Sequence, residues 1–221
     1  DNAHVKASSS SVAWTNSEDL QSGEIKYTSV SGSDSGTSYT VAMDGSTKPQ
    51  GAHNVNVPGL TDGSTYTLAV SGTDLAGNPA NASHTGIVYD TTAPGFGALT
   101  PAAGAYIRAA TRTVQWSNDE DLASGVVKYT STSGSDSGAE YSSTLVGLLS
   151  KGNQSKDLGA LTDGSVYTLS ISATDLAGNA GSSSNNNIKY DVTNPGFGSI
   201  LPGNNYMIGA SSRVVKWTNG E

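Results

Sequence analysis

Two stretches of the chain share a pattern in which less polar and polar side chains alternate before a sharp turn. They are Leu60–Asn78 and Leu161–Asn179. In the second stretch Tyr167, Leu169 and Ile171 alternate with threonine and serine, and this period of two places the apolar side chains on one face. The pattern predicts a half-buried strand of an antiparallel sheet, and the Asp, Gly and Asn residues that follow it predict a turn.

The region around the second stretch contains further short apolar segments, separated by clusters of Gly, Asn, Asp and Ser. We expect strands at residues 97–100, 107–116, 126–132, 140–145, 156–158, 165–173 and 187–191. The pattern is weakest over residues 156–158. Seven short strands with frequent turn signals and no segment of helical period predict an all-β fold, an antiparallel β-sandwich.

Three tryptophans mark a repeat of whole domains. Trp14, Trp116 and Trp217 each lie two residues after a valine and two residues before an asparagine, and they are 102 and 101 residues apart. A period near a hundred residues is the size of a domain, so we expect tandem sandwiches rather than the short units of a solenoid. The predicted boundaries are 1–92 for repeat 1, 93–193 for repeat 2 and 194–221 for the first strands of a third repeat.

The two ends of the sequence do not contain complete repeats. Nothing ahead of His4 matches residues 94–101, and residues 194–221 cover only the first two predicted strands of a repeat. Two interpretations stay open. The sequence is a section of a longer array, or a neighbouring chain supplies the missing strand at an unpaired sheet edge.

Several residues of each repeat carry a resemblance to a known family. Trp116, Tyr129, the step Leu161-x-x-Gly-x-x-Tyr167 and the turn Ala-x-Asp-x-Ala-Gly-Asn resemble a fibronectin type III module. The resemblance implies that Trp116 packs across the core. It also implies that Tyr167 forms a tyrosine corner, with its hydroxyl bonded back to the preceding turn, and that Tyr66 does the same in repeat 1.

A second resemblance concerns the segments that end each repeat. Tyr89-Asp-Thr-Thr-Ala-Pro-Gly-Phe-Gly97 recurs as Tyr190-Asp-Val-Thr-Asn-Pro-Gly-Phe-Gly198. These segments are similar to the linkers between Ig-like repeats of very large bacterial surface adhesins, whose repeats extend a stalk and often bind calcium. Phe96 and Phe197 are expected to pack into the seam between repeats, with stacking on a ligand as the alternative.

The composition agrees with an all-β protein and narrows its partners. Hydrophobic residues make up 35% of the chain, charged residues 14%, and 27 residues are glycine, which favours strands and turns over helices. With 11 basic and 19 acidic residues the net charge is −8, which argues against a nucleic-acid partner and leaves room for divalent cations. There is no cysteine, and no apolar run has the length of a membrane span, so we expect no membrane insertion in this sequence.

The residue types needed for catalysis do not form a recognisable site. His4, His53 and His84 all lie in the first repeat, without counterparts in the second. No serine lies in a nucleophile elbow or a phosphate-binding loop. We therefore expect that the protein is not an enzyme.

Acidic residues gather at the predicted contact between repeats 1 and 2. The strand order of a sandwich directs three carboxylates of repeat 1 towards four of repeat 2, namely Asp34, Asp62 and Asp90 towards Asp119, Glu120, Asp121 and Asp175. Like charges this close need water or a cation between them, and calcium binds six to eight oxygens. We expect a calcium ion at this junction, with candidate ligands Asp62, Asp90, Glu120, Asp121 and Asp175.

A simpler role for some of these residues is turn formation. Asp74 and Asp175 would serve the turn after the central strand, with Asn and Gly supplying positive φ, and Asp62 and Asp163 the turn before it. No run of the sequence has the regular spacing of an EF-hand or of a calcium-binding nonapeptide repeat. Both roles stay open at this point.

The sequence favours a mechanical function. Duplicated domains with similar cores and linkers suit a structural spacer of an extracellular stalk, adhesin or filament on a bacterial surface, with further copies of the repeat as partners. One alternative is a carbohydrate-binding or accessory module of a secreted protein, for which Tyr39 and Tyr141 are the nearest candidates for an aromatic platform, unless they pack within the sheet. Another is a self-assembling fibre subunit, completed by strand exchange through unpaired edges.

Overall fold

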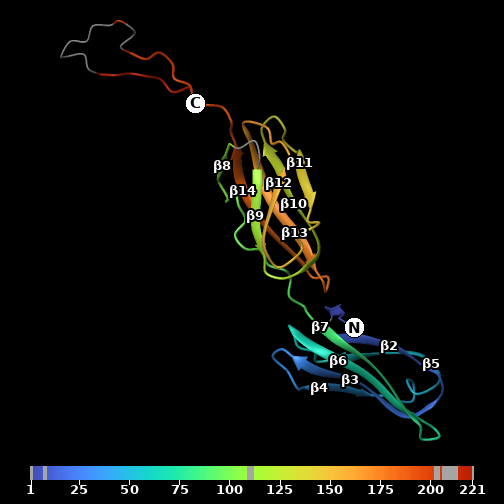
Figure 1. Cartoon of the computed structure of the whole chain (residues 1–221). Helices are drawn as coiled ribbons and strands as arrows, with labels where there is room; N and C mark the ends of the chain where they lie inside the picture. Colours follow the sequence, from blue (N-terminus) through green and yellow to red (C-terminus); the bar gives the residue numbers. More distant parts are fainter. Residues whose placement is uncertain (1, 7–8, 109–111, 202–204, 206–213, 221) are drawn as a thin grey trace.

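The chain forms two β-sandwiches that follow one another, and residues 191–201 lead away from the second sandwich (Figure 1). The structure is a computed structural model, and it describes residues 2–6, 9–108, 112–201, 205 and 214–220. Every regular element in these residues is a β-strand. No helix there has the length and apolar character needed to cross a lipid bilayer.

Repeat 1 consists of one sheet of five strands and one of two. The strands are β1 (His4–Val5), β2 (Ser9–Asn16), β3 (Leu20–Ser31), β4 (Ser38–Ala42), β5 (Gly51–Pro58), β6 (Ser64–Asp74) and β7 (Pro79–Tyr89). The larger sheet has the order β1-β7-β6-β3-β4, and β2 pairs with β5 in the smaller sheet. The pairings are antiparallel, except that β1 runs parallel to β7.

Repeat 2 has the same arrangement. Its strands are β8 (Tyr106–Ile107), β9 (Arg112–Asn118), β10 (Leu122–Ser133), β11 (Glu140–Thr144), β12 (Gly152–Leu158), β13 (Ser165–Asp175) and β14 (Ala180–Tyr190). The sheet orders are β11-β10-β13-β14-β8 and β12-β9. The predicted fold class, tandem antiparallel sandwiches of the fibronectin III and Ig-like kind, is confirmed.

The prediction of one strand over residues 107–116 is wrong. Tyr106–Ile107 pairs in parallel with β14 in the larger sheet, whereas Arg112–Asn118 pairs with β12 in the smaller one. Residues 109–111 lie outside the described residues. The chain therefore passes from one sheet to the other within this segment, which a run of apolar residues alone does not reveal.

Two further strands are longer than their apolar patterns predict. The strand expected over 156–158 is Gly152–Leu158, and the strand expected over 187–191 is Ala180–Tyr190. Both extensions consist of polar and small residues that pair through their backbones. The segment 97–100 contributes only two bridges, Phe96 with Asn118 and Thr100 with Gln115.

Each sandwich has its own core. In repeat 2 Trp116 is 3% exposed and lies between the two sheets, as the resemblance implies. Its Nε1 donates a hydrogen bond to Asn118 Oδ1 (2.8 Å), and Asn118 Nδ2 donates to two carbonyls of the β11–β12 loop, those of Leu148 and Ser150. The repeated Trp-x-Asn motif therefore ties the core to a loop, since an indole N–H that is buried needs an acceptor.

The predicted tyrosine corner is confirmed and has an additional member. Tyr167 Oη accepts a hydrogen bond from the backbone N–H of Thr162 (2.7 Å) and donates one to Asp136 Oδ2 (2.6 Å). Asp136 also accepts hydrogen bonds from Ser131 Oγ (2.8 Å) and Tyr141 Oη (3.0 Å). The half-buried carboxylate thereby links the turn before β13 to the turn between β10 and β11.

Repeat 1 has the same network around Asp34. Its Oδ2 accepts hydrogen bonds from Tyr66 Oη (2.6 Å) and Tyr39 Oη (3.0 Å). Burial by itself would raise the pKa of Asp34, but the hydroxyl groups that donate to it, above all that of Tyr66, hold the pKa well below its usual range. The pKa of Asp136 is lowered in the same way. Both groups are therefore ionised in the folded protein at neutral pH.

The network predicts the effect of a Tyr167→Phe substitution. Losing a hydrogen bond to a charged group should lower the free energy of unfolding of repeat 2 by about 2 kcal/mol. Urea unfolding followed by tryptophan fluorescence measures this. The control is Tyr106→Phe, which removes only a solvent-exposed hydrogen bond from Lys189, since Tyr106 is 70% exposed. A Tyr167→Phe variant within about 0.5 kcal/mol of the original chain would contradict the account.

A pH dependence follows from the lowered pKa of Asp136. Its folded-state pKa lies below the unfolded value of about 3.9, so its stabilisation is complete well above that pH and is lost as the pH falls below it. The original chain should lose stability between about pH 5 and pH 2.5, and the Asp136→Asn variant should lose less over the same range. Equal slopes for the two proteins would show that Asp136 does not contribute.

Candidate functional site

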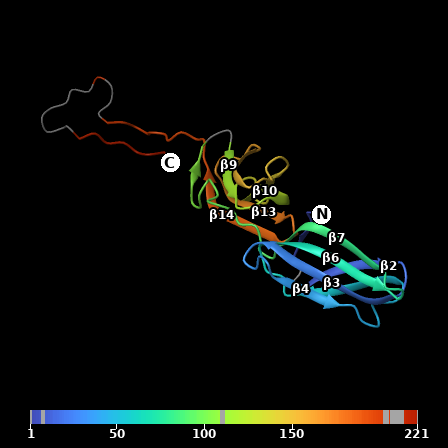
Figure 2. The same cartoon turned by 60° about the horizontal axis from the view of Figure 1, so that its bottom comes forward.

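The candidate site lies where repeat 1 meets repeat 2. The two sandwiches are joined end to end, and the N-terminal strand lies beside the junction (Figures 1 and 2). Repeat 1 contributes the end of β7 and Asp90, which follows it. Repeat 2 contributes two loops at its near end, Asp119–Asp121 between β9 and β10, and residues 176–179 between β13 and β14.

Direct contacts hold these loops to repeat 1. Asn179 Nδ2 donates a hydrogen bond to the carbonyl oxygen of Asp90 (3.0 Å), and Lys6 Nζ donates one to the carbonyl oxygen of Gly178 (2.9 Å). Gly181 lies against Pro94 so closely that a Cβ atom there would overlap with the Pro94 carbonyl oxygen. The junction is therefore a packed contact and not an open hinge.

Two aspartates hold the linker itself. Asp62 accepts hydrogen bonds from the backbone N–H of Thr91 and from Thr92 Oγ1 (2.6 Å), while Asp119 Oδ1 accepts one from the backbone N–H of Gly95 (2.8 Å). The hydrogen bond from Thr92, followed by that from the Thr91 amide, lowers the pKa of Asp62. The linker is thus attached to repeat 1 at its start and to repeat 2 at its end, and we call these two attachments the linker clamps.

Three of the predicted ligands come together at the junction. Asp90, Glu120 and Asp175 each place a carboxylate oxygen within 4.8 Å of the others, and we call them the junction carboxylates. Asp175 is 1% exposed, and the other two are half-buried. Among the residues that the structure describes, this is the one group of three or more side chains that could hold a metal ion.

The junction carboxylates repel one another. Two unit charges 4.8 Å apart repel by about 1 kcal/mol in water and by about 3 kcal/mol at an effective dielectric constant of about 20. Burial, followed by the negative charges of Asp90 and Asp175, raises the pKa of Glu120 to about 7. In the absence of a cation, this end-to-end contact therefore carries an electrostatic cost.

Turn formation, the simpler role considered for Asp74 and Asp175, is present in both repeats. Asp175 accepts hydrogen bonds from the backbone N–H and from Nδ2 of Asn179, both at 2.8 Å, and Asp74 accepts the same pair from Asn78. Gly178, with φ of 87°, supplies the left-handed conformation that the turn requires. Asn179 is not left-handed and acts instead through its side chain. Asp175 thus stabilises a turn and also faces the junction.

Two of the predicted ligands, Asp62 and Asp121, do not belong to the junction carboxylates. Asp62 holds Thr91 and Thr92, and Asp121 Oδ1 accepts a hydrogen bond from the backbone N–H of Lys151 (2.7 Å). Each of these carboxylates is already engaged by an amide of its own repeat. Their assignment as metal ligands stays a prediction, since a carboxylate that accepts one hydrogen bond keeps further lone pairs.

The linker clamps are the feature that the sequence analysis missed. The turn role expected for Asp62 and Asp163 is incomplete, because both reach the outgoing linker. Asp163 accepts hydrogen bonds from the backbone N–H of Val192 and from Thr193 Oγ1, both at 2.7 Å, just as Asp62 does from the first linker. The signal was present in the sequence as an aspartate followed by a threonine 30 residues later in both repeats.

Several solved structures of repeated modules are similar to the chain. No family model matches the chain, and no curated protein sequence matches it. A solved tetra-tandem repeat from the extending region of a large adhesion protein shows 21% identity and a TM-score of 0.40 over 89% of this chain. This chain spans 48% of the length of that structure.

Two other solved structures are similar to the chain. The fibronectin(III)-like modules of Clostridium thermocellum CbhA show 12% identity and a TM-score of 0.37, covering 86% of this chain and 90% of theirs. The FN1–FN3 domains of chicken CNTN1 show 11% identity and a TM-score of 0.35, covering 84% and 65%. They are modules of the kinds that the sequence resembles, and the fold itself rests on the strand pairing described above.

The repulsion predicts an unusual effect of a Glu120→Gln substitution. In the presence of a chelator at pH 8, above the Glu120 pKa of about 7, removing this charge should stabilise the chain by about 1 kcal/mol or more. The gain should shrink as the pH falls towards 5. A carboxyl group whose pKa is raised by folding lowers the stability only at pH values above its pKa in the unfolded chain. The control is Glu18→Gln at the equivalent, exposed position of repeat 1. If thermal unfolding at pH 8 shows that Glu120→Gln is no more stable than the original chain, the repulsion between the junction carboxylates is contradicted.

Proposed function

We propose that the chain is a non-enzymatic structural repeat that acts as a spacer in an extracellular stalk, adhesin or filament on a bacterial surface. The observation that carries this proposal is the pair of linker clamps. Thr92 is held by Asp62 of repeat 1, and Gly95 is held by Asp119 of repeat 2. A linker attached at both ends within a few residues limits the rotation of one repeat against the other.

The recurrence of the same attachment supports the proposal. Asp163 holds the linker that leaves repeat 2 as Asp62 holds the linker that leaves repeat 1. The second attachment does not recur, because Gly220 stands at the position equivalent to Asp119. A row of repeats that keeps its ends at a set distance needs each outgoing linker to be held at its start, so further copies of the same repeat are the expected neighbours.

We also propose that calcium binds the junction carboxylates and completes the junction. Calcium–oxygen distances of about 2.3–2.6 Å place two ligands of one ion at most about 5 Å apart, and the oxygens of Asp90, Glu120 and Asp175 lie within 4.8 Å of one another. The ligand set consists of carboxylate oxygens alone, which suits a hard cation. A bound ion would turn the repulsion between the repeats into an attraction.

The alternative of a carbohydrate-binding module is less well supported. Its candidate platform, Tyr39 and Tyr141, is half-buried, and both hydroxyl groups donate to the half-buried aspartates Asp34 and Asp136. Each ring also packs edge-on against the corner tyrosine of its repeat, with centroids about 6 Å apart. Side chains engaged in this way serve the core of the sandwich.

Calcium should raise the stability of the chain. Extracellular calcium modules bind at about 10⁻⁴–10⁻³ M, so 10 mM calcium should stabilise by about 1.5–2.5 kcal/mol, or roughly 5–10 °C in the melting temperature. The rise should be lost in Glu120→Gln and kept in Glu18→Gln. Equal melting temperatures in chelator and in 10 mM calcium would rule out calcium binding at the junction but would not contradict the spacer proposal.

The spacer role itself is tested by a distance distribution. The chain has no native cysteine, so spin labels can be placed at Leu75→Cys and Ser137→Cys, two exposed positions in different repeats. The distribution should be narrow, and replacing both Asp62 and Asp119 by alanine should broaden it. Asp44→Ala, which removes an exposed turn aspartate of repeat 1, is the control. A broad distribution in the original chain would contradict the proposal.

A further inference from the structure

The N-terminal strand of repeat 1 takes part in the contact with repeat 2. Strand β1 runs parallel to the end of β7, and the carbonyl oxygen of Val5 accepts a hydrogen bond from the backbone N–H of Asp90 (2.9 Å). The next residue, Lys6, is exposed, and its Nζ donates a hydrogen bond to the carbonyl oxygen of Gly178 (2.9 Å), which lies 172 residues later in the chain. The strand is therefore attached to both repeats at once.

Three hydrogen bonds form a closed ring across the junction. The backbone N–H of Asp90 donates to Val5, and the carbonyl oxygen of Asp90 accepts a hydrogen bond from Asn179 Nδ2 (3.0 Å). Because Lys6 follows Val5 and Gly178 precedes Asn179, the hydrogen bond from Lys6 to Gly178 closes the ring. We call this set of five residues the junction ring. It joins three segments of the chain, so none of the three can turn about a single contact.

The junction ring also holds two of the junction carboxylates in place. Asp90 belongs to the ring through its backbone, and Asn179 is bound to the carboxylate of Asp175 through its N–H and its Nδ2, both at 2.8 Å. Lys6 brings a positive charge to this end of repeat 2, where the negative charges gather. An ammonium group at such a place contributes both a hydrogen bond and a modest attraction.

The far end of repeat 2 has the same part of the ring that repeat 1 supplies at the junction. The carbonyl oxygen of Ile107 accepts a hydrogen bond from the backbone N–H of Asp191 (3.0 Å), in a second pairing of parallel strands. Arg108 follows Ile107 as Lys6 follows Val5, and it is exposed as well. A basic side chain therefore stands at the same place at the end of each repeat.

The opposite end of repeat 1 has the part of the ring that repeat 2 supplies. Asp74 binds Asn78 through the same pair of hydrogen bonds, both at 2.8 Å. The turn has the same backbone shape, since φ is 91° at Gly77 and 87° at Gly178. Each repeat thus presents a basic donor at one end and an asparagine turn at the other, which is the pairing of unlike surfaces that adds units in a row.

We infer that Lys6 is the positioning residue of the junction, and that its contact with the turn between β13 and β14 sets the angle between the repeats. Arg108 has the same role towards a further repeat that carries the turn Asp-Leu-Ala-Gly-Asn. The linker clamps hold one segment of repeat 1 against repeat 2, and the junction ring attaches a second segment, β1. The inference rests on the proposed spacer role, for which this angle matters.

Spin labels at Leu75→Cys and Ser137→Cys test the role of Lys6 in the complete chain. In chelator, Lys6→Met should broaden the distance distribution by about twofold, since one of two attachments is lost. Lys6→Arg should keep it narrow, because a guanidinium group can donate the same hydrogen bond. The matched control is Lys48→Met, as Lys48 donates to a carbonyl oxygen within its own repeat. A Lys6→Met distribution as narrow as the original would overturn the inference and leave the spacer proposal intact.

The same measurement in calcium separates the two proposals. If the original chain gives a broad distribution in chelator and a narrow one in calcium, the ion and not Lys6 sets the angle, and the inference is overturned while the spacer proposal stands. A distribution that is broad in both conditions would contradict both. The result expected from the junction ring is a narrow distribution of the original chain in both conditions.

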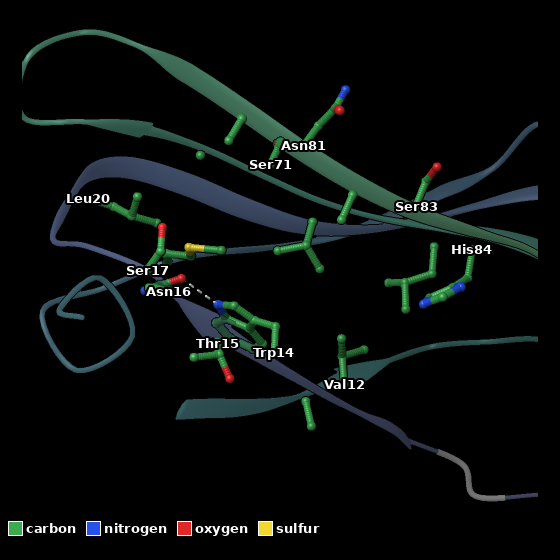
Figure 3. A pocket seen from close by; sticks show the side chains of 17 residues that line it. Val12, Trp14, Thr15, Asn16, Ser17, Leu20, Ser71, Asn81, Ser83 and His84 are labelled. Carbon is green, nitrogen blue, oxygen red and sulfur yellow. Dashed lines mark hydrogen bonds between the residues drawn. The ribbon is translucent and has the colours of Figure 1, made fainter. Parts of the chain in front are cut away.

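Hydrogen exchange tests the attachment of β1 directly. The backbone N–H groups of Val88 and Asp90 donate to carbonyl oxygens of the N-terminal segment, so their exchange reports how often this segment opens. Lys6→Met should make both exchange about fivefold faster, the effect of losing one hydrogen bond. The indole N–H of Trp14, which donates to Asn16 Oδ1 (2.9 Å; Figure 3), should keep its rate because repeat 1 stays folded. Unchanged rates at Val88 and Asp90, or a rise that the Trp14 proton shares, would overturn the inference.

Discussion

The linker between the repeats is held at both ends, and the rest of the arrangement depends on this restraint. Asp62 fixes the first residues of the linker to repeat 1, and Asp119 fixes Gly95 to repeat 2. With the linker in place, Asp90, Glu120 and Asp175 are brought within 4.8 Å of one another. The clamped linker therefore holds like charges close together, and a cation bound between them, as proposed above, would offset their repulsion.

A second use of aspartate stabilises the turns within each sandwich. Asp34 and Asp136 accept hydrogen bonds from the corner tyrosine, from a tyrosine of the neighbouring strand and from a serine. These charges are half-buried and well satisfied, which makes the turns at one end of each repeat a single connected unit. In repeat 1 this unit lies beside Thr61, which directly precedes the linker clamp residue Asp62.

Much of the fold could be predicted from the sequence, and the failures share a physical cause. The alternation around Tyr167 and Leu169 predicts β13, and the tyrosine corner and the buried Trp116 follow from the resemblance. The break between Ile107 and β9 could not be predicted, because alternation does not reveal a change of sheet. The polar half of β14 could not be predicted either, since its pairing is through the backbone.

The site was predicted in part for a related reason. The strand order of a sandwich tells which end of the domain an aspartate occupies, and this was enough to bring Asp90, Glu120 and Asp175 together. It does not predict which backbone amide each aspartate side chain contacts. Asp62 and Asp121 accept hydrogen bonds from the backbone N–H groups of Thr91 and Lys151. The difference in burial between the equivalent residues Trp14 and Trp116 also needed the structure, because their sequence contexts are alike.

Residual dipolar couplings of the chain in calcium test the central claim most directly, because they report whether two domains tumble as one body. The clamped junction predicts that couplings from repeat 1 and repeat 2 fit one common alignment tensor. Two independent tensors of different magnitude would show that the repeats move freely and that the junction does not set their distance.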